Sequence, residues 1–460
     1  MGNLQSQSIT WQRVFGGPGD DQGRAITQTL DGGYAFVGKG VTANFYKLDA
    51  YGNLEWLKNF TSGGFLVLNN IIQLSDSNYI IGGNKLTTQE IILIKTNKLG
   101  DTLWSKILSY NGLATSLSSL KLLNDGGFIM CGDVLFSSPP GTRAYVTRVD
   151  SKGNLIWHND YMDSTNTGAN DIIALPSGSF FFTSWTYNNL SYGFLNKLNS
   201  GGVRIWSKQI LGFNNYPRID VANILQEETN SLAIDGTYDS LQLYRFGAII
   251  KYDTNGTQIF FRSYPPYGSG FMHRALNGNY LFTGLGGAPN YDVPFLRLDT
   301  QANIRYYTEI NSGGNELDNG EYIDKTSDNG SIIVGETTYG GSTFYANFLV
   351  IKTDSAGNAP PVKIISNTEI YPKEFKLYPN YPNPFNNQTN FQVDIPKKGY
   401  INVIIYNTLG QQIQNIYEGV LASGEHLFMW DVNSSIPSGV YFIKVSYNSS
   451  FKILKVAFVK

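Results

Sequence analysis

The 460-residue sequence carries 34 basic and 36 acidic residues, a balance that favours neither nucleic acid nor an anionic membrane surface as a partner. Charged residues make up only 15% of the chain and glycine contributes 49 residues, which indicates an all-β protein rich in turns. No apolar run is long enough to span a membrane, and the single cysteine, Cys131, excludes an intrachain disulfide. Residues 1–7 lack the basic and apolar regions of a signal peptide.

A repeated turn organises residues 1–358. Its first copy runs from Asp49 through Gly52 to Trp56, and further copies follow at intervals of about 50 residues. The lead Asp or Asn can accept backbone hydrogen bonds while the glycine takes a positive φ, so each copy predicts a hairpin turn. The lead residues are Asp49, Asn97, Asp150, Asn199, Asp253, Asp299 and Asp354.

A basic residue precedes each lead residue by two positions, on the strand face that the lead acid shares. A catalytic base normally occurs once, so a base in every unit indicates an ion pair or an apolar stem that each unit needs to fold. These bases are Lys47, Lys95, Arg148, Lys197, Lys251, Arg297 and Lys352.

The repeat length predicts a seven-bladed β-propeller with about four strands in each blade. Second hairpin turns such as Asp31-Gly32-Gly33 separate the first two strands of a unit, and a glycine such as Gly38 recurs after the second strand, where close packing is expected. The seventh unit runs into Pro360-Pro361, which cannot extend a ladder. Residues 9–15 resemble a spare tryptophan strand, so we expect them to complete the seventh blade and close the ring.

The pattern changes after residue 358. Residues 359–374 are predicted to be a linker, and residues 375–460 a small β-sandwich. Its candidate strands are 389–395, 400–407, 411–416, 425–430, 440–447 and 451–459.

Three motifs give this second region a resemblance to a known family. They are residues 381–386 (Tyr-Pro-Asn-Pro-Phe-Asn), 406–411 (Tyr-Asn-Thr-Leu-Gly-Gln) and 438–444 (Ser-Gly-Val-Tyr-Phe-Ile-Lys), followed by a closing strand that contains lysine. In this order they resemble the type A C-terminal sorting domain of the type IX secretion system. Asn387 departs from the pattern, since many relatives carry proline there.

The resemblance implies partners and a destination. It implies export to the outer-membrane surface or the medium, with the translocon and a sortase-like protease as partners. The residues that it marks as the sorting motif are Pro382, Asn383, Pro384, Phe385, Gly439, Tyr441 and Lys444. The propeller region is similar only in outline to kelch and other secreted bacterial propeller repeats, which implies a fold and no chemistry.

Aromatic residues near the loops between second and third strands are the candidates for ligand binding. Flat rings on a rigid scaffold suit sugar stacking or protein contact, and the alternative is that they cover the core. The candidates are Trp185, Tyr187, Tyr238, Tyr244, Tyr291 and Tyr339.

The sequence shows no motif for catalysis. Its three histidines lie in separate units, and it has no serine elbow and no phosphate-binding loop. The acids of two glycine-rich connectors, Asp20 and Asp21 with Glu316 and Asp318, are the only cluster that could bind calcium or supply paired carboxylates. We therefore expect no enzyme and no cofactor other than calcium at these acids.

Three functions remain open from the sequence. The leading hypothesis is an exported binding or adhesion propeller with a glycan or protein ligand. The alternatives are a propeller enzyme that degrades polysaccharides, as a hydrolase or lyase, and a structural component of a surface layer.

Overall fold

The structure is a computed structural model, and it shows an all-β chain. It describes residues 9–16, 20–40, 43–60, 66–164, 166–187, 191–212, 219–228, 230–240, 244–264, 270–284, 291–313, 317–338, 346–361, 363–364, 374–380, 382–386, 388–397, 399–421, 424–432 and 436–459. The chain divides into two compact units, Met1–Ile364 and Ile365–Lys460. The first unit includes residues 359–364, which the sequence assigned to the linker; most of the remaining linker lies outside the described residues.

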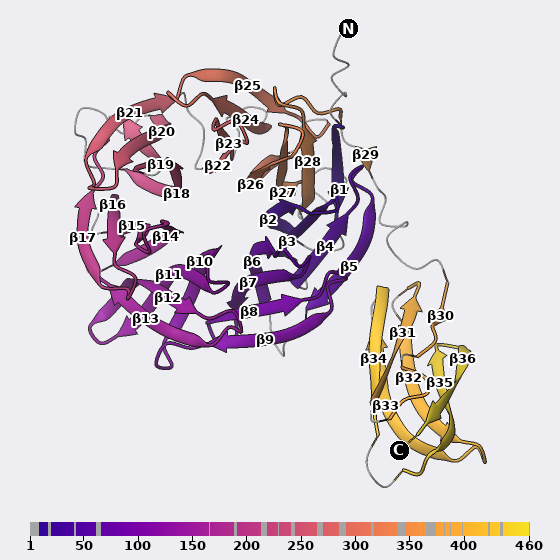
Figure 1. Ribbon diagram of the computed structural model, residues 1–460. Coiled ribbons are helices and arrows are strands. Elements are labelled where there is room, and N and C mark those ends of the chain that lie inside the picture. Colours follow the sequence, from indigo (N-terminus) through magenta and orange to yellow (C-terminus); the bar gives the residue numbers. More distant parts are fainter. Residues whose placement is uncertain are drawn as a thin grey trace. The chain divides into compact units, whose positions relative to one another are not determined.

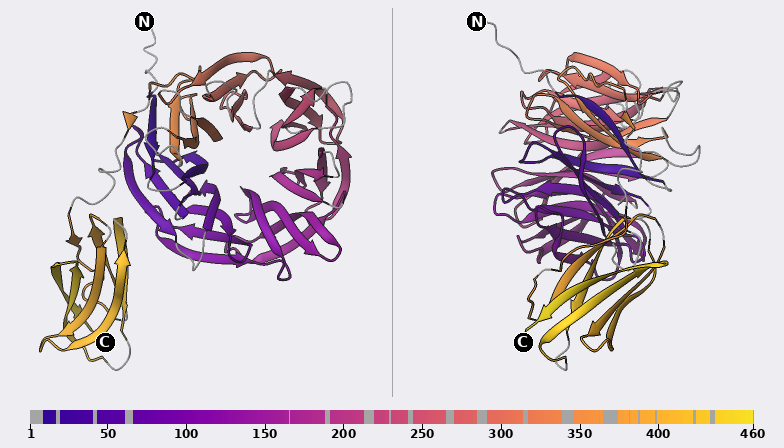
Figure 2. Two further views of the ribbon diagram at one scale, coloured as in Figure 1. Left: turned by 180° about the vertical axis from the view of Figure 1, so that it is seen from behind. Right: turned by 90° about the vertical axis from the view of Figure 1, so that its right-hand side faces the viewer.

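Seven antiparallel sheets form a ring in the first unit, as predicted (Figures 1 and 2). The first strand of each sheet lies nearest the centre of the ring, and the last strand lies on its rim (Figure 1). Blade 1 contains β2 (Gln22–Gln28), β3 (Tyr34–Lys39), β4 (Ala43–Leu48) and β5 (Leu54–Phe60); blade 2 contains β6 (Leu66–Gln73), β7 (Tyr79–Lys85), β8 (Glu90–Thr96) and β9 (Thr102–Leu108); blade 3 contains β10 (Ala114–Leu122), β11 (Phe128–Ser137), β12 (Pro140–Val149) and β13 (Leu155–Tyr161).

The other four blades follow in chain order. Blade 4 contains β14 (Thr167–Ala174), β15 (Phe180–Tyr187), β16 (Ser191–Leu198) and β17 (Arg204–Gln209); blade 5 contains β18 (Asp220–Glu228), β19 (Ser231–Ser240), β20 (Tyr244–Asp253) and β21 (Gln258–Tyr264); blade 6 contains β22 (Gly270–Arg274), β23 (Tyr280–Gly284), β24 (Val293–Leu298) and β25 (Ile304–Ile310); blade 7 contains β26 (Asp318–Lys325), β27 (Ser331–Thr337), β28 (Asn347–Thr353), β1 (Trp11–Phe15) and β29 (Lys363–Ile364).

Blade 7 joins the two ends of the propeller. The N-terminal strand β1 pairs antiparallel with β28, with Trp11 opposite Lys352 and Phe15 opposite Phe348. The short strand β29 then pairs in parallel with β1, an addition that the sequence analysis missed because the two prolines before it argued against a strand. The ring is therefore closed by backbone hydrogen bonds between segments about 340 residues apart in the chain, and no edge of β28 is left open.

The repeated turns form as the sequence indicates, but the repeated bases pair differently. The lead Asp49 accepts backbone hydrogen bonds from the amides of residues 51 and 53, each at 2.8 Å. Lys47 forms ion pairs with Asp31 of the other hairpin turn, at 3.0 Å between Nζ and Oδ2, and with Glu55 at 2.9 Å. Arg148 and Lys352 pair likewise with Asp125 and Asp328 of the other hairpin turns. The lead acid Asp299 also forms an ion pair, but with Arg305 rather than with a repeated base.

Each rim tryptophan packs on the turn of the next blade. A Cβ on Gly100 of blade 2 would lie only 2.8 Å from the Trp56 ring of blade 1, so this glycine is needed for the contact as well as for its φ of +80°. The same contact joins Trp11 to Gly52, Trp104 to Gly153, Trp157 to Gly202 and Trp206 to Gly256. The contact therefore occurs at five successive blade boundaries, from the boundary of blades 7 and 1 to the boundary of blades 4 and 5.

At the next boundary, between blades 5 and 6, a smaller aromatic ring is combined with a larger turn residue. Phe260 stands in blade 5 where the earlier blades have tryptophan, and Ala302 stands in the turn of blade 6 where they have glycine, with a φ of 63°. Both residues belong to the core between blades 5 and 6. The smaller ring leaves space for the methyl group of the alanine, which explains why a non-glycine residue is tolerated there.

The second unit contains two sheets, as the sandwich prediction requires. One has the order β30 (Lys376–Leu377), β31 (Gln388–Ile395) and β34 (Gly424–Asp431); the other has the order β33 (Gln412–Leu421), β32 (Gly399–Asn407), β35 (Gly439–Tyr447) and β36 (Ser450–Phe458). A single apolar core lies within this unit, around Trp430 and Phe385. The six predicted strands are present, and β30 was missed because it is only two residues long.

The contact between tryptophan and glycine gives a test of the fold. Replacing Gly100→Ala should lower the free energy of unfolding more than Gly32→Ala, because both glycines have φ near +80° but a Cβ on Gly32 meets nothing within 4 Å. We expect about 1 kcal/mol for the backbone conformation alone and a further 1–3 kcal/mol for the clash with Trp56. Urea denaturation measures both values. Equal losses in the two variants, or no smaller loss for Gly100→Ala in a Trp56→Ala background, would contradict this role of the ring.

Candidate functional site

The innermost strands surround a central channel. A cavity of about 590 Å³ lies among side chains from all seven blades, contributed by β2, β6, β10, β14, β18, β22 and β26. The wall is mainly polar: Arg24, Asn69, Asn70, Ser118, Ser119, Lys121, Asn170, Asp171, Asn223, His273, Glu321 and Tyr322, with Phe271 and several aliphatic side chains among them. Every blade of the propeller unit therefore contributes side chains to the channel wall.

Irregular pairing shapes the channel wall. The innermost strand shifts register against the second strand in six blades, at Arg24, Asn69, Ser118, Asn170, Ala222–Asn223 and Glu321. Each shift leaves an extra residue on the strand next to the channel, as a β-bulge does. A glycine stands opposite most of these shifts; a Cβ on Gly132, for example, would collide with the carbonyl oxygen of Ser116. In each of these six blades, the register shift places a polar side chain on the channel wall.

Asp171 links three blades at the wall. Its carboxylate accepts a hydrogen bond from the Ser119 hydroxyl of blade 3 at 2.5 Å and pairs with Lys121 of the same blade at 3.0 Å. Its other oxygen accepts the Ile224 amide of blade 5 at 3.1 Å. Asn70 makes the equivalent contact two blades earlier, because its side-chain oxygen accepts the Leu120 amide of blade 3. The Asp171 carboxylate also accepts the Ile172 amide, so this buried group is balanced by a cation and three donors.

A second set of charges lies where blade 7 meets its neighbours. Arg24 of blade 1 pairs with Glu321 of blade 7 at 3.3 Å. Asp324 of blade 7 accepts the Thr27 hydroxyl at 3.1 Å and lies 3.5 Å from His273 of blade 6. Burial lowers the pKa of the His273 imidazole more than Asp324 raises it. The imidazole is therefore neutral at pH 7, and it can donate or accept a hydrogen bond.

Two aromatic rings interrupt the polar wall. Phe271 of blade 6 and Tyr322 of blade 7 have ring centroids 4.0 Å apart, and both rings are half-buried. Burial raises the pKa of the Tyr322 hydroxyl well above its ordinary value, so this group stays protonated. The pair gives the channel one apolar, flat surface beside its amides and hydroxyls.

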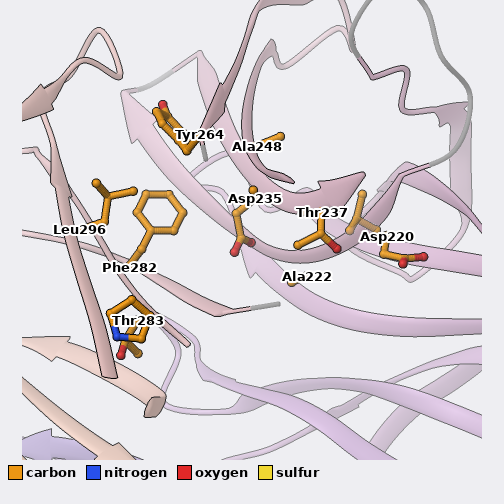
Figure 3. Close-up of a pocket in the computed structure, with 13 residues that line it drawn as sticks. Asp220, Ala222, Asp235, Thr237, Ala248, Tyr264, Phe282, Thr283 and Leu296 are labelled. Atoms are coloured by element: carbon orange, nitrogen blue, oxygen red, sulfur yellow. The ribbon is translucent and has the colours of Figure 1, made fainter. Parts of the chain in front are cut away.

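A smaller cavity lies between blades 5 and 6. It measures about 100 Å³ and is bounded by the apolar side chains of Phe282, Leu296 and Tyr264 and by the carboxyl group of Asp235 (Figure 3). Asp235 is 4% exposed, and its carboxyl group accepts hydrogen bonds from the backbone and the side chain of Asn223. Burial raises the pKa of Asp235 to about 7, although the Asn223 donors oppose the shift.

The predicted aromatic residues do not form one surface among the described residues. Tyr187 and Tyr291 are 54% and 36% exposed on blades 4 and 6. The Tyr238 ring is buried against Phe246 and Phe261. The ring of Trp185 packs over Gly168, Tyr339 lies outside the described residues, and so does the side chain of Tyr244. Among the described candidates, Tyr187 and Tyr291 are thus exposed and Trp185 is partly exposed.

The predicted acidic cluster is used locally. Asp318 is buried, and its carboxylate accepts hydrogen bonds from the hydroxyl and the amide of Ser312, each at 2.8 Å. Asp21 is also buried, Asp20 is exposed, and Glu316 lies outside the described residues. The described part of the chain contains no group of three or more His, Cys, Asp or Glu side chains placed to hold a metal ion.

The sorting-motif residues divide between core and surface. Phe385 is buried against Trp430 and Phe458, and Tyr441 is buried with its hydroxyl donating to the Pro437 carbonyl at 2.7 Å. Pro382, Asn383, Pro384 and Gly439 are exposed. Asn383 nonetheless ties the motif to the last strand, because its side-chain oxygen accepts the Ala457 amide. Lys444 places its ammonium group 4.8 Å from the centre of the Phe451 ring.

Comparison with protein families identifies the second unit. Residues 379–460 match the secretion system C-terminal sorting domain, which agrees with the resemblance drawn from the motifs. The chain is therefore a propeller protein with a type IX sorting domain, which directs it to secretion or to the outer-membrane surface. No curated protein matches the chain. Among the described residues, no helix is long and apolar enough to cross a membrane.

Solved structures with similar folds are distant in sequence. A lectin from Burkholderia pseudomallei has a TM-score of 0.51 and 10% identity, and the match covers 78% of this chain and 99% of the lectin. A protein of unknown function from Bacteroides caccae has a TM-score of 0.40 and 13% identity, with 59% and 88% covered. A puromycin hydrolase has a TM-score of 0.49 and 11% identity, with 82% covered here and 59% of the enzyme. At these identities the likeness shows the fold alone.

Asp235 of the smaller cavity was missed from the sequence, although a signal was present. When the repeats are aligned on the glycine after the second strand, the preceding residue is Val37, Ile81 and Val334 in three blades but Asp235 in blade 5. The other three blades carry Cys131, Thr183 and Thr283, so Asp235 is the one carboxylic acid at this position. A buried carboxylic acid costs stability. Such a position marks a candidate site.

The raised pKa of Asp235 predicts how stability changes with pH. Its folded pKa, about 7, lies above the unfolded value near 3.9, so between these values the folded chain holds a proton that the unfolded chain has lost. Asp235 therefore lowers the free energy of unfolding as pH rises from about 4 to 7. We expect Asp235→Asn to become more stable relative to the wild type as pH rises, by a few kcal/mol in total. Asp133→Asn, whose parent pKa is about 6, should show a smaller change.

Urea denaturation of the wild type and both variants from pH 4 to pH 8 measures this difference. Groups that titrate elsewhere are shared by all three proteins and cancel in the comparison. A stability difference for Asp235→Asn that is constant across this range would show that the carboxyl group titrates normally.

Proposed function

We propose that this exported propeller is a binding protein, with no catalytic activity, that takes a glycan into its central channel. The observation that carries the proposal is the channel wall itself, where amides and hydroxyls from several blades lie beside the ring pair of Phe271 and Tyr322. A sugar ring presents hydroxyl groups at its edge and an apolar C–H face, so it matches a wall of this kind.

The charges of the wall support a neutral, polar ligand. Asp171 is paired with Lys121, and Glu321 is paired with Arg24. Each of these two acids is therefore neutralised by a base of the channel wall. An anionic or cationic ligand would need to break one of these pairs, which costs free energy where the groups are partly buried. Hydrogen-bonding groups such as Asn70 and Ser118 remain on the wall without a full charge.

A channel-blocking variant tests the proposal. Ser118 is exposed on the channel wall, so Ser118→Trp should fill part of the cavity and reduce glycan affinity at least tenfold. Ser105→Trp makes the same replacement at an exposed position of the rim strand β9 and should bind as the wild type does. The full chain is screened on a glycan array, and the affinity of each variant for the best glycan is measured by calorimetry.

Each other outcome contradicts a part of the proposal. Equal affinity of the two variants would place the ligand outside the channel, for example at Tyr187 or Tyr291. Release of reducing sugar from the bound glycan would make the protein a polysaccharide-degrading enzyme. Failure of every glycan to bind, with the protein folded, would leave a protein ligand or a structural surface-layer role.

We also infer that the sorting domain has two partners, the secretion translocon and a sortase-like protease that separates it from the propeller. The family match to residues 379–460 supports this inference. A periplasmic reporter fused to residues 360–460 should reach the cell surface or the medium in a host with this secretion system, without most of the fused segment. A reporter fused only to residues 360–374 is the control and should stay in the periplasm, as should the full fusion if the inference is wrong.

A further inference from the structure

We propose that the cavity between blades 5 and 6 is a second binding site, separate from the channel, for a compact apolar group that carries one hydrogen-bond donor. Nothing in the proposed channel function requires this cavity. Its described lining comes from β18 to β21 of blade 5 and from β23 and β24 of blade 6, whereas the channel is lined by the innermost strands of all blades.

The cavity arises from a missing side chain at one repeat position. Four residues before the repeated base, the third strand carries Ala43, Ile91, Ala144, Val293 or Phe348 in five blades, and each of these side chains is buried. Blades 4 and 5 carry glycine instead. A Cβ on Gly193 would lie 2.4 Å from Val221 of blade 5, so a neighbour fills that space. A Cβ on Gly247 would meet nothing within 4 Å.

A second exception places a polar group in the same space. Asp235 stands one residue before the repeat glycine, where three blades carry valine or isoleucine. Its carboxyl oxygens receive hydrogen bonds from Asn223 alone among the described residues, with Nδ2 at 3.2 Å from Oδ2. A carboxyl group has about four acceptor positions, so Oδ2 retains the capacity to accept a donor from a ligand.

The remaining wall sets the character of the ligand. Phe282, Leu296 and Pro294 supply apolar contacts from blade 6, and Tyr264 supplies a ring from the rim of blade 5. In Figure 3 the Asp235 carboxyl group lies between Phe282 and Thr237. The volume of about 100 Å³ is of the same order as the roughly 150 Å³ of an engineered core cavity that binds benzene. One six-membered ring with a short polar arm is therefore a suitable size.

Asp235 is the reason that we expect the ligand to carry a hydrogen-bond donor. An empty apolar space could have been lined by valine here as in blades 1 and 7, with Val37 and Val334. A buried carboxyl group lowers stability unless it is hydrogen-bonded, and it adds affinity only for a ligand that can donate to it. A hydroxyl or an ammonium group on an apolar body meets both the acid and the apolar wall.

Small aromatic probes test the site in the full chain. Benzyl alcohol and benzylamine should bind, and toluene should bind at least tenfold more weakly, as measured by ligand-observed NMR and calorimetry. Gly247→Val should weaken benzyl alcohol binding at least tenfold, because the new side chain fills the open space. Gly439→Val, on a strand of the sorting domain where the atom nearest to an added Cβ is a Tyr441 ring carbon 3.8 Å away, is the matched control and should bind normally.

Further measurements keep the outcome clear. Gly247→Ala adds one methyl group and should weaken binding less, which covers the case in which the valine variant does not fold. Ser118→Trp should leave benzyl alcohol binding unchanged, so failure of the channel proposal and failure of this one are distinguishable. A crystal soaked in benzyl alcohol should show the ring beside Asp235. The proposal is overturned if neither donor probe binds, if the folded Gly247 variants bind as the wild type does, or if toluene binds equally well.

Discussion

The packing of a rim aromatic on the turn of the next blade is the constraint on which the ring depends. Because Trp56 occupies the space that a side chain on Gly100 would need, the turn glycine serves two blades at once. At the boundary of blades 5 and 6, the smaller ring of Phe260 is combined with the larger turn residue Ala302. The closing strand β1 makes the tryptophan contact, since Trp11 packs on Gly52 and donates its indole hydrogen to the Ala50 carbonyl at 3.0 Å. This strand is therefore joined to blade 1 by the same contact that joins neighbouring blades.

Local chemistry explains why so much of the fold could be predicted. Each turn can be predicted from eight consecutive residues, without knowledge of the neighbouring blades. These residues contain the lead acid, a glycine with positive φ and the start of the aromatic strand. The number of blades and the strand that completes blade 7 follow from counting these turns. The partner of Lys47 could not be predicted in this way, because Asp31 approaches it only when two hairpins of one sheet are folded together. The burial of Tyr238 could not be predicted for a similar reason, since it is decided by the packing of Phe246 and Phe261.

The channel and the cavity beside Gly247 depend on contacts between strands and between blades. These contacts are difficult to infer from one sequence. The channel wall needs the register shifts of the innermost strands, and a shift is visible only once the second strand is placed opposite. The cavity beside Gly247 needs a glycine without a filling neighbour, and the contrast with Gly193 shows that glycine alone does not decide the matter. What the sequence does contain is the exception itself, an acid at a repeat position that carries valine, isoleucine, cysteine or threonine in the other blades.

A repeat fold makes such exceptions interpretable, because every blade is a control for the others. The same backbone position is packed with valine in blades 1 and 7, with isoleucine in blade 2 and with Cys131, Thr183 and Thr283 in blades 3, 4 and 6, so a blade can form without an acid there. Asp171 differs, because it accepts hydrogen bonds from blades 3 and 5. It therefore stabilises the ring as well as lining the channel. A polar residue that ties blades together is explained by the fold. For a polar residue that is buried beside an open space, with an acceptor position to spare, we propose a ligand.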